Sequence, residues 1–492
     1  MESLLATGAG GVGAAAAAVG GLVAAAAIAV APRNQSGNAP PAVPGLPIVG
    51  NLHQLKEKKP HQTFAKWSET YGPVYSIKTG ASSIVVVNST EVATEAIVSK
   101  FSSISTRKLP KTLSVISRDK NMVALSDYGD FHKTAKRNLM MSTLGFSAQK
   151  QFRDTRDKMV NNMLRAFHRM VTDEPKAALN FRNVFRDELY RLSLIESLGE
   201  DVSSIYVEEF GREISKLEMY NATVEDMMKC AIEVDWRDFF PYLSWVPNKS
   251  FESTVFNTVS RKDAVMRALI KKQMERIARG ESRISYLDFL MEENTQLTAE
   301  ELTLLVWELL VESSDTTFVS SEWAMYEIAK NPDKQERLYQ EIREVCGDET
   351  VTEEHLPRMP YLNAVFHETL RRHSPVTLLP PRMVNEDITI AGYDVPPGTQ
   401  EWDSPEEWLP ERFLDGSYQL ANMYKTLAFG GGRRVCAGAR QATTIACISI
   451  ARFVQEFEWR LRKGDEDKVD TVQLTTYKLQ PLHVHLTPRA RK

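Results

Sequence analysis

The sequence has few cysteines and no cluster of metal-binding residues. Its 492 residues include four cysteines that lie far apart, without a CxxC pair or a cysteine–histidine cluster. A disulfide framework and a structural zinc site are therefore excluded. A chemical role for one single cysteine remains open. The four residues are Cys230, Cys346, Cys436 and Cys447.

The chain also lacks an excess of charge of either sign. The 60 Lys and Arg residues nearly balance the 64 Asp and Glu residues, giving a net charge of −4. A nucleic-acid-binding protein is not indicated, because it needs a basic face. With 43% hydrophobic and 25% charged residues, the chain is globular rather than disordered. A mean hydropathy of −0.30 argues against a polytopic membrane protein.

No charged residue occurs between Ser3 and Pro32. A cleaved signal peptide would have a positive start, and a transit peptide would carry Arg and Ser, so neither pattern matches. We predict an uncleaved membrane anchor over residues 1–32, with a disordered Ala/Gly tail as the alternative. The basic residues that follow place the body in the cytosol, on the endoplasmic reticulum or the plastid outer envelope. These residues are Arg33, Lys56, Lys58 and Lys59.

A proline-rich segment at residues 33–50 follows the predicted anchor, and its prolines favour a stiff hinge. We find no clear boundary beyond it, so residues 51–492 are predicted to form one large domain. The fold class is mainly α with small β-sheets. We expect a hairpin at residues 73–87 around Gly80, helices over about 130–345, and a strand within Val472 to Val484.

Several motifs of common enzyme classes are absent. The chain has no Gly-rich loop between a strand and a helix, so neither a dinucleotide-binding fingerprint nor a P-loop is present. It also has no GxSxG or HExxH.

The strongest local signal is the run FGGGRRVCAG, from Phe429 to Gly438. Its glycines, among them Gly430 and Gly432, let the backbone turn tightly beside a flat group. Cys436 precedes a predicted helix, whose N-terminus is expected to lower the thiol pKa. Such a thiolate is either a nucleophile, which needs a nearby base, or a metal ligand.

These residues resemble the heme-binding signature FxxGxRxCxG of the cytochromes P450. The resemblance implies heme b held by the Cys436 thiolate. It also implies cofactor contacts from the conserved positions of the loop and from two other basic segments. The implied cofactor-binding residues are Phe429, Gly430, Gly432, Cys436 and Gly438, with Arg382 and Arg434 at the propionates and Lys133 as a further contact.

Other family landmarks occur in the expected order. The polar run from Glu312 to Thr317 interrupts an apolar helical pattern (Leu302 to Ile328) and resembles the oxygen-activating stretch, which implies proton-delivering roles for Asp315 and Thr316. Hydroxyls there can bond carbonyls one turn back. Glu368 and Arg371 match ExxR, and Arg412 lies in the PERF motif; all three are implied to be structural. ExxR by itself has little weight, because Glu209 and Arg212 also match it.

Over the whole chain, the amino-acid sequence is similar to those of plant ent-kaurene oxidases and their relatives in cereals. This implies three successive oxidations of one methyl of a diterpene hydrocarbon, from ent-kaurene to ent-kaurenoic acid, in gibberellin biosynthesis. It also implies O2, membrane lipid and an NADPH–cytochrome P450 reductase as partners. Hydroxylation of a related ent-diterpene in defence metabolism is the alternative within the enzyme class.

Two features depart from the family pattern. Ser313 and Ser314 stand where Gly or Ala is usual, which can alter oxygen handling. Gln400 runs directly into Glu401, where the family has a further strand and turn, so a segment is missing near 400/401. A lost strand exposes unpaired backbone groups on its neighbours. A catalytically inactive paralogue or splice form is therefore the alternative from another class.

Overall fold

The structure is a computed structural model that describes most of the chain. The described residues are 39–55, 60–281, 283–293, 296–385, 389–390, 407–414, 426–470 and 473–489. The predicted anchor (residues 1–32), the first part of the hinge (33–38) and the junction at 400/401 lie outside them. In the described ranges, none of the helices has the length and apolar character needed to cross a membrane.

The chain divides into two compact units. The smaller one draws its described residues from three stretches of sequence, Met1–Ala93, Trp236–Pro247 and Thr389–Glu401, and the larger one from the rest. Residues distant in sequence therefore fold together in the smaller unit. The predicted domain boundaries stay a prediction.

The smaller unit contains the expected hairpin. Strands β1 (Val74–Thr79) and β2 (Ser82–Val87) pair antiparallel. Gly80 in the turn has φ +60°, and a Cβ there would lie 2.2 Å from the carbonyl oxygen of Phe239. Helix α2 (His61–Tyr71) supplies aromatic side chains to the small core around Tyr75, and the short helix α3 (Thr90–Thr94) follows the hairpin.

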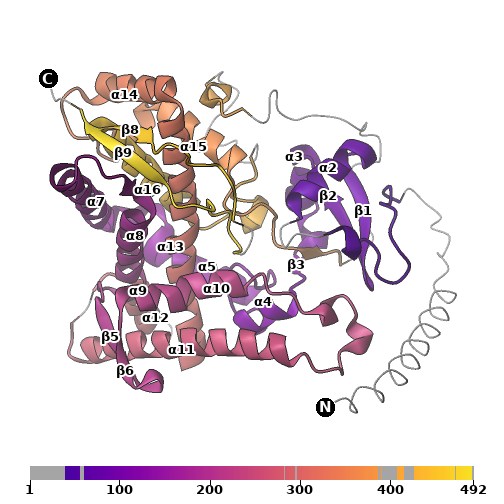
Figure 1. The fold of residues 1–492 in the computed structure, drawn as a ribbon. Coiled ribbons are helices and arrows are strands. Elements are labelled where there is room, and N and C mark those ends of the chain that lie inside the picture. Colours follow the sequence, from indigo (N-terminus) through magenta and orange to yellow (C-terminus); the bar gives the residue numbers. More distant parts are fainter. Residues whose placement is uncertain are drawn as a thin grey trace, which may run out of the picture. The chain divides into compact units, whose positions relative to one another are not determined.

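The larger unit is mainly helical, which confirms the fold class. Figure 1 shows α13 running through its middle, and α8 and α16 pack against α13. Its helices are α4 (Lys111–Ile116), α5 (Asp130–Leu139), α6 (Phe146–Gln151), α7 (Arg153–Asp173), α8 (Phe181–Leu198), α9 (Lys216–Tyr220), α10 (Asp226–Cys230), α11 (Lys249–Ala278), α12 (Tyr286–Glu293), α13 (Ala299–Lys330), α14 (Pro332–Cys346), α15 (Pro360–Arg372) and α16 (Ala439–Glu456).

Local sequence signals define both ends of α13. The Thr298 hydroxyl accepts a hydrogen bond from the Glu301 backbone N–H, and the Glu301 carboxylate accepts one from the Thr298 N–H. This reciprocal cap starts the helix. Pro332 opens the next helix after Asn331. The helix is buried along most of its length because other helices surround it.

The sheets of the larger unit are small. Strand β9 lies between β4 and β8, and β3–β7 and β5–β6 form two-stranded sheets. The strands are β3 (Thr106–Arg107), β4 (Leu179–Asn180), β5 (Ser204–Val207), β6 (Arg212–Ser215), β7 (Arg382–Met383), β8 (Phe457–Leu461) and β9 (His483–Pro488). The β5–β6 hairpin interrupts the stretch predicted as helical.

The predicted strand at residues 472–484 was largely wrong. Within its described part, only His483 and Val484 belong to a strand. The preceding residues turn into the interior instead, where the backbone of Leu474 bonds the Met228 carbonyl and that of Thr476 bonds the Pro375 carbonyl. Alternating polarity here reflects an inward-turning loop rather than a sheet face.

Candidate active site

The cysteine loop folds back on itself just before α16. The Cys436 N–H donates to the Phe429 carbonyl at 2.9 Å, and Gly432 begins a 3-10 turn, Gly432–Arg434. Gly432 has φ +63°, and a Cβ there would lie 2.5 Å from the Ile97 carbonyl oxygen. Gly430 also has a positive φ, +68°, but a Cβ there would meet nothing closer than 3.7 Å. The loop therefore needs glycine at 432 for space as well as conformation.

Gly432→Ala is expected to displace the loop and reduce heme loading. Both the left-handed backbone and the close carbonyl oppose a side chain, and strain of this kind costs about 1–3 kcal/mol. Gly430→Ala carries the conformational strain without the collision, so it is the matched control. The bound-heme content of the two purified variants would be compared. Equal loss in both would show that the Ile97 contact is unimportant.

Cys436 faces an internal space. Its side chain keeps accessible surface although protein atoms enclose it. Burial, together with the Glu312 carboxylate, raises the pKa of the thiol to about 11, although the N–H groups of Gly438 and Ala439 and the charge of Lys136 oppose the rise. The N–H groups at the helix N-terminus lower the thiol pKa as expected, but burial outweighs them, so the net shift is upward. A thiol of this kind suits a cationic metal better than a free nucleophile.

The polar stretch of α13 also borders an internal space. Glu312 is exposed, and Ser313 and Thr316 are half-buried, in a helix that is otherwise almost wholly buried. Burial and neighbouring Glu308 raise the pKa of Glu312 well above its usual range. Glu312 lies close enough to Cys436 to influence its thiol electrostatically.

The hydroxyls of this stretch bond carbonyls one turn back, as predicted. Ser313 donates to Leu309 at 2.7 Å, and the hydroxyl of Ser314 makes the same type of bond. Ser313 also donates to the Ser193 hydroxyl on α8 at 2.9 Å. The helix nevertheless stays continuous. Ser313 thus joins α13 to its neighbour α8.

The side chains of Asp315 and Thr316 differ in exposure and in hydrogen-bond partners. Asp315 is 1% exposed, and its Oδ1 accepts a hydrogen bond from the Tyr477 hydroxyl at 2.5 Å. Thr316 is more accessible, and its hydroxyl donates to the Glu312 carbonyl at 3.3 Å. The structure therefore places Thr316 towards the inner space and Asp315 in the protein interior.

Three arginines form a cationic cluster. Arg107 on β3 lies directly opposite Arg382 on β7, and Arg434 follows in the cysteine loop. Burial and the neighbouring guanidinium groups lower the pKa of Arg107 to about 9, and burial and Arg434 lower that of Arg382 to about 10. Like charges opposite each other in a sheet are destabilising unless an anion lies between them.

Unsatisfied donors in this cluster support an anionic ligand. Nε and Nη1 of Arg434, and Nη1 of Arg382, are buried without hydrogen-bond partners in the described residues. Buried guanidinium donors normally have acceptors, and carboxylates match their geometry. The two propionates of heme fit this set of donors. Sequence reasoning missed Arg107, because nothing in its local sequence marks it; only the β3–β7 pairing brings it here.

The lysines of α5 differ in position. Lys133, which the resemblance implied as a cofactor contact, is exposed and pairs with Asp130 at 3.4 Å. Lys136, one turn later, donates to the Val435 carbonyl at 2.9 Å and to the Arg433 carbonyl at 3.2 Å. Lys136 is therefore the lysine that contacts the cysteine loop.

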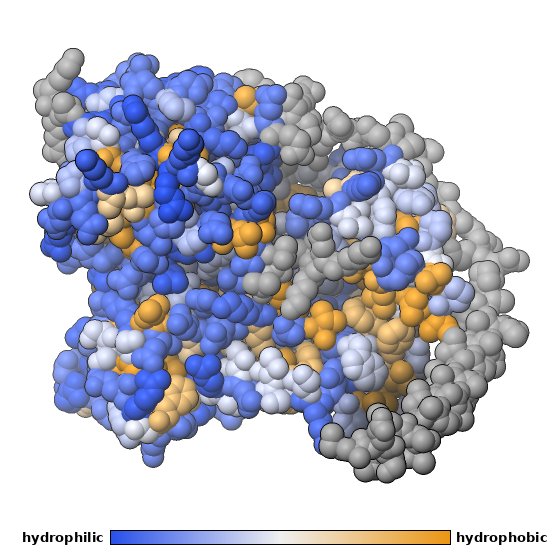
Figure 2. Space-filling view, viewed as in Figure 1, coloured by the Kyte–Doolittle hydropathy of each residue, from blue (hydrophilic) through white to orange (hydrophobic). Residues whose placement is uncertain are grey.

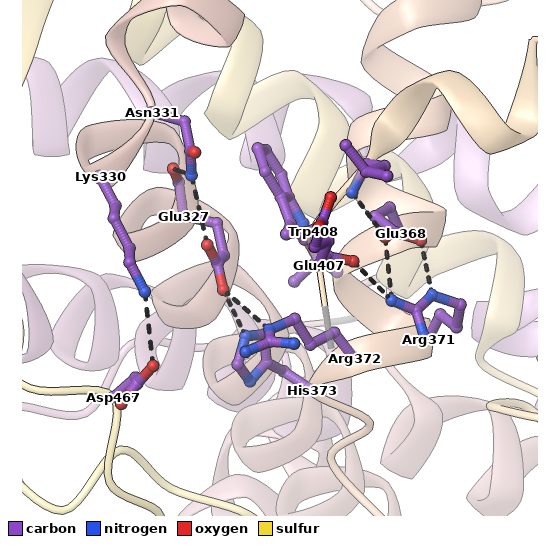
Figure 3. Close-up of polar contacts among 12 residues, drawn as sticks. Glu327, Lys330, Asn331, Glu368, Arg371, Arg372, His373, Glu407, Trp408 and Asp467 are labelled. Carbon is purple, nitrogen blue, oxygen red and sulfur yellow. Dashed lines mark hydrogen bonds and ion pairs between the residues drawn. The ribbon is translucent and has the colours of Figure 1, made fainter. Parts of the chain in front are cut away.

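Glu368, Arg371 and Arg412 form a buried ion network, part of which Figure 3 shows. Arg371 donates to both Glu368 oxygens, at 2.7 and 3.0 Å, and Arg412 donates to Oε1 at 3.3 Å. The Leu409 N–H donates to the same oxygen at 2.7 Å. Arg371 also donates to the Glu407 carbonyl at 3.0 Å. The network thus joins α15 to the turn Pro410–Phe413 and the residue before it.

Glu368→Gln is expected to lower the free energy of unfolding by about 3–5 kcal/mol, because two buried arginines lose their counter-charge. Glu209→Gln is the control: Glu209 also starts an ExxR match, but it is exposed and pairs with Arg267 at 2.5 Å. Loss of this exposed ion pair should lower the free energy of unfolding by less than about 1 kcal/mol. Chemical denaturation of both variants tests this, and equal destabilisation would contradict the buried network's importance.

A family model for Cytochrome P450 matches residues 40–483. The chain therefore belongs to the cytochrome P450 family, whose members are monooxygenases that bind heme through a cysteine thiolate. They use O2 and electrons from a redox partner to oxidise hydrophobic substrates.

The more specific similarity is to rice proteins of Oryza sativa subsp. japonica. The chain is 72% identical to "Ent-kaurene oxidase 2" (98% of this chain, 99% of the relative) and 73% identical to "Ent-kaurene oxidase-like 3" (100% of both). It is 65% identical to "Ent-sandaracopimaradiene 3-hydroxylase" (92% of both). The alignment with "Ent-kaurene oxidase-like 3" spans 504 positions. Because the chain has only 492 residues, this alignment contains gaps in the chain.

Proposed function

We propose that this chain oxidises ent-kaurene to ent-kaurenoic acid, by three successive oxidations of one methyl group. The similarity to "Ent-kaurene oxidase 2" and to "Ent-kaurene oxidase-like 3" supports the substrate. The carrying structural observation is Cys436 facing an internal space close to Glu312 in the polar stretch of α13. A hydrocarbon without polar groups is recognised there by shape and apolar contact.

The residues that would hold heme are divided between its centre and its edge. Cys436 would bind the iron, while Phe429, Gly430, Gly432 and Gly438 would shape the loop against the ring. Heme supplies the electron transfer and O2 activation on which the oxidation depends. Its propionates would be bound by basic side chains. We assign this role to Arg107, Arg382 and Arg434, with Lys133 and Lys136 near that edge.

The polar residues of α13 would serve the reaction itself. Asp315 and Thr316 move protons to the inner space. Glu312 has a different proposed role. The first oxidation gives the substrate a hydroxyl group, and the Glu312 carboxyl group can hydrogen-bond that hydroxyl and hold it for the next step. This contact would make successive oxidation of one carbon efficient.

A membrane location suits such a substrate, because the hydrocarbon partitions into lipid. We propose that residues 1–32 anchor the body on the cytosolic side of the endoplasmic reticulum or the plastid outer envelope. The electron donor would be an NADPH–cytochrome P450 reductase. The smaller unit by itself exposes large hydrophobic side chains, and Figure 2 shows hydrophobic surface over it. They include Leu46, Ile84, Val85, Tyr242 and Trp245.

A second candidate is hydroxylation of a related ent-diterpene in defence metabolism. It is favoured by the 65% identity to "Ent-sandaracopimaradiene 3-hydroxylase". The catalytically inactive alternative rests on the segment missing near 400/401, and the alignment gaps agree with a missing segment without locating it.

Feeding both hydrocarbons to reductase-supplemented microsomes tests these candidates. Ent-kaurenoic acid as the main product supports the proposal. A mono-hydroxylated product from ent-sandaracopimaradiene alone would favour the second candidate, and no product from either would favour the inactive one.

A further inference from the structure

A chain of three buried hydroxyl and carboxyl groups leads away from the active site. The Tyr477 hydroxyl donates to Asp315 Oδ1 at 2.5 Å and lies 3.3 Å from the Tyr220 hydroxyl. All three side chains are less than 5% exposed. They come from α13, from the end of α9 and from the loop before β9, so only the folded chain brings them together.

The outer end of this chain lies at a small cavity. Tyr220 lines a space of about 30 Å³ together with Arg186 and Lys216. That volume is enough for a water molecule. Lys216 is half-buried and neighbouring Asp187 is exposed, so the cavity adjoins solvent. The inner end is Asp315, whose neighbour Thr316 is more accessible and faces the inner space.

We propose that Tyr220 and Tyr477 are the route by which protons pass from solvent to Asp315, and from there to the inner space in front of Cys436. This inference rests on the proposed monooxygenase function, because that reaction consumes protons at this place. Tyr220 and Tyr477 touch neither substrate nor cofactor, and act through Asp315.

Each transfer is balanced. Water in the cavity gives a proton to Tyr220, Tyr220 passes its own proton to Tyr477, and Tyr477 passes its proton to Asp315. Each tyrosine gains one proton and gives up another, so both hydroxyls remain protonated. The net change is one proton moved from solvent to Asp315. Burial raises the pKa of both tyrosines, so they rest in the neutral form that such a relay needs.

The charged groups beside Tyr220 and Tyr477 favour proton transfer from solvent towards Asp315. The Arg186 guanidinium lies 4.9 Å from the ring centre of Tyr220, and that of Arg182 lies 5.4 Å from that of Tyr477. Cations beside the rings stabilise negative charge that develops while a phenol gives up its proton. The acidic groups on this side include Asp187 at the cavity, Glu225 near Tyr220, and Glu322, which pairs with Arg182 at 2.8 Å.

In a merely structural role, the Tyr477 hydroxyl would serve only to bond Oδ1 of the buried Asp315 carboxylate, and the Tyr220 hydroxyl would be dispensable. Tyr220→Phe is therefore the decisive variant, because it leaves the Tyr477–Asp315 bond in place and breaks only the route. Tyr190→Phe is the matched control. Tyr190 packs against the Tyr220 ring at 5.2 Å, but its hydroxyl bonds Thr223 at 3.0 Å.

The experiment compares Tyr220→Phe, Tyr477→Phe and Tyr190→Phe in the full-length, heme-loaded protein with reductase. Product and peroxide formed per NADPH are measured in H2O and D2O. The infrared carboxylate band of Asp315, assigned with Asp315→Asn, reports independently whether the Tyr477 bond persists. We expect product per NADPH to fall about tenfold in Tyr220→Phe and Tyr477→Phe, with more peroxide and a larger solvent isotope effect. Only Tyr477→Phe should move the band.

Unchanged coupling in Tyr220→Phe with an intact Asp315 band would overturn the route, and so would an equal loss in Tyr190→Phe. Peroxide per NADPH is measured with either diterpene hydrocarbon present, so the route is judged whichever one is oxidised. Failure of the unmodified chain to form ent-kaurenoic acid would count against the proposed substrate alone.

Discussion

Cys436→Ala is expected to abolish heme–thiolate binding and with it all diterpene oxidation. The side chain is the only described cysteine that faces the internal space; the other three are buried. No other described cluster of His, Cys, Asp and Glu residues can hold a metal ion. Turnover should fall by more than about a thousandfold, because a reaction that depends on a metal centre proceeds very slowly without it. Heme content and turnover of the purified variant measure it.

Cys346→Ala is the control for this substitution. Cys346 is buried at the end of α14 and takes no part in the site. It should keep full heme content. Heme–thiolate absorbance retained by Cys436→Ala would contradict the assignment of the ligand, and alkylation of Cys436 in an active, heme-free protein would revive the nucleophile hypothesis.

Glu312→Leu is expected to stop the reaction after its first oxidation. A leucine removes the exposed carboxyl of α13 that lies close enough to Cys436 to influence its thiol. The hydrocarbon itself should still bind, because it makes no polar contact. The alcohol loses one hydrogen bond, so the ratio of ent-kaurenoic acid to alcohol should fall about tenfold or more. Product analysis by mass spectrometry measures this ratio.

Glu312→Gln separates hydrogen bonding from charge. Glutamine keeps a donor and an acceptor at this position, so it should restore most of the acid product. If leucine and glutamine gave the same product ratio as the unmodified chain, Glu312 would have no role in holding the intermediate. If both abolished the first oxidation, its role would lie in the reaction common to all steps.

Features defined by neighbouring residues were predicted well. The β1–β2 hairpin depends on the turn at Gly80, and α13 depends on its apolar pattern and caps. The cysteine loop and the ExxR and PERF segments are contiguous runs, so their sequence suffices to recognise them. The structure then adds that Glu368 and Arg412 meet, which their spacing alone does not show.

Features defined by packing were missed. Arg107 joins the cationic cluster only through the pairing of β3 with β7, and Tyr477 reaches Asp315 only because its loop turns inward. The net upward shift of the Cys436 thiol pKa was missed, because burial is a property of the whole fold and outweighs the local effect of the helix N-terminus. The direction of the Asp315 side chain likewise depends on a partner 162 residues away in sequence.

The reduced, CO-bound difference spectrum of the membrane-expressed chain is the most direct test of the central claim. The account predicts a maximum at the position typical of thiolate-ligated heme, which would show that the chain forms the site whether or not a segment is missing near 400/401, as the sequence predicts. A maximum at the position of the denatured form, or no heme signal, would contradict the assignment of this chain as a working monooxygenase.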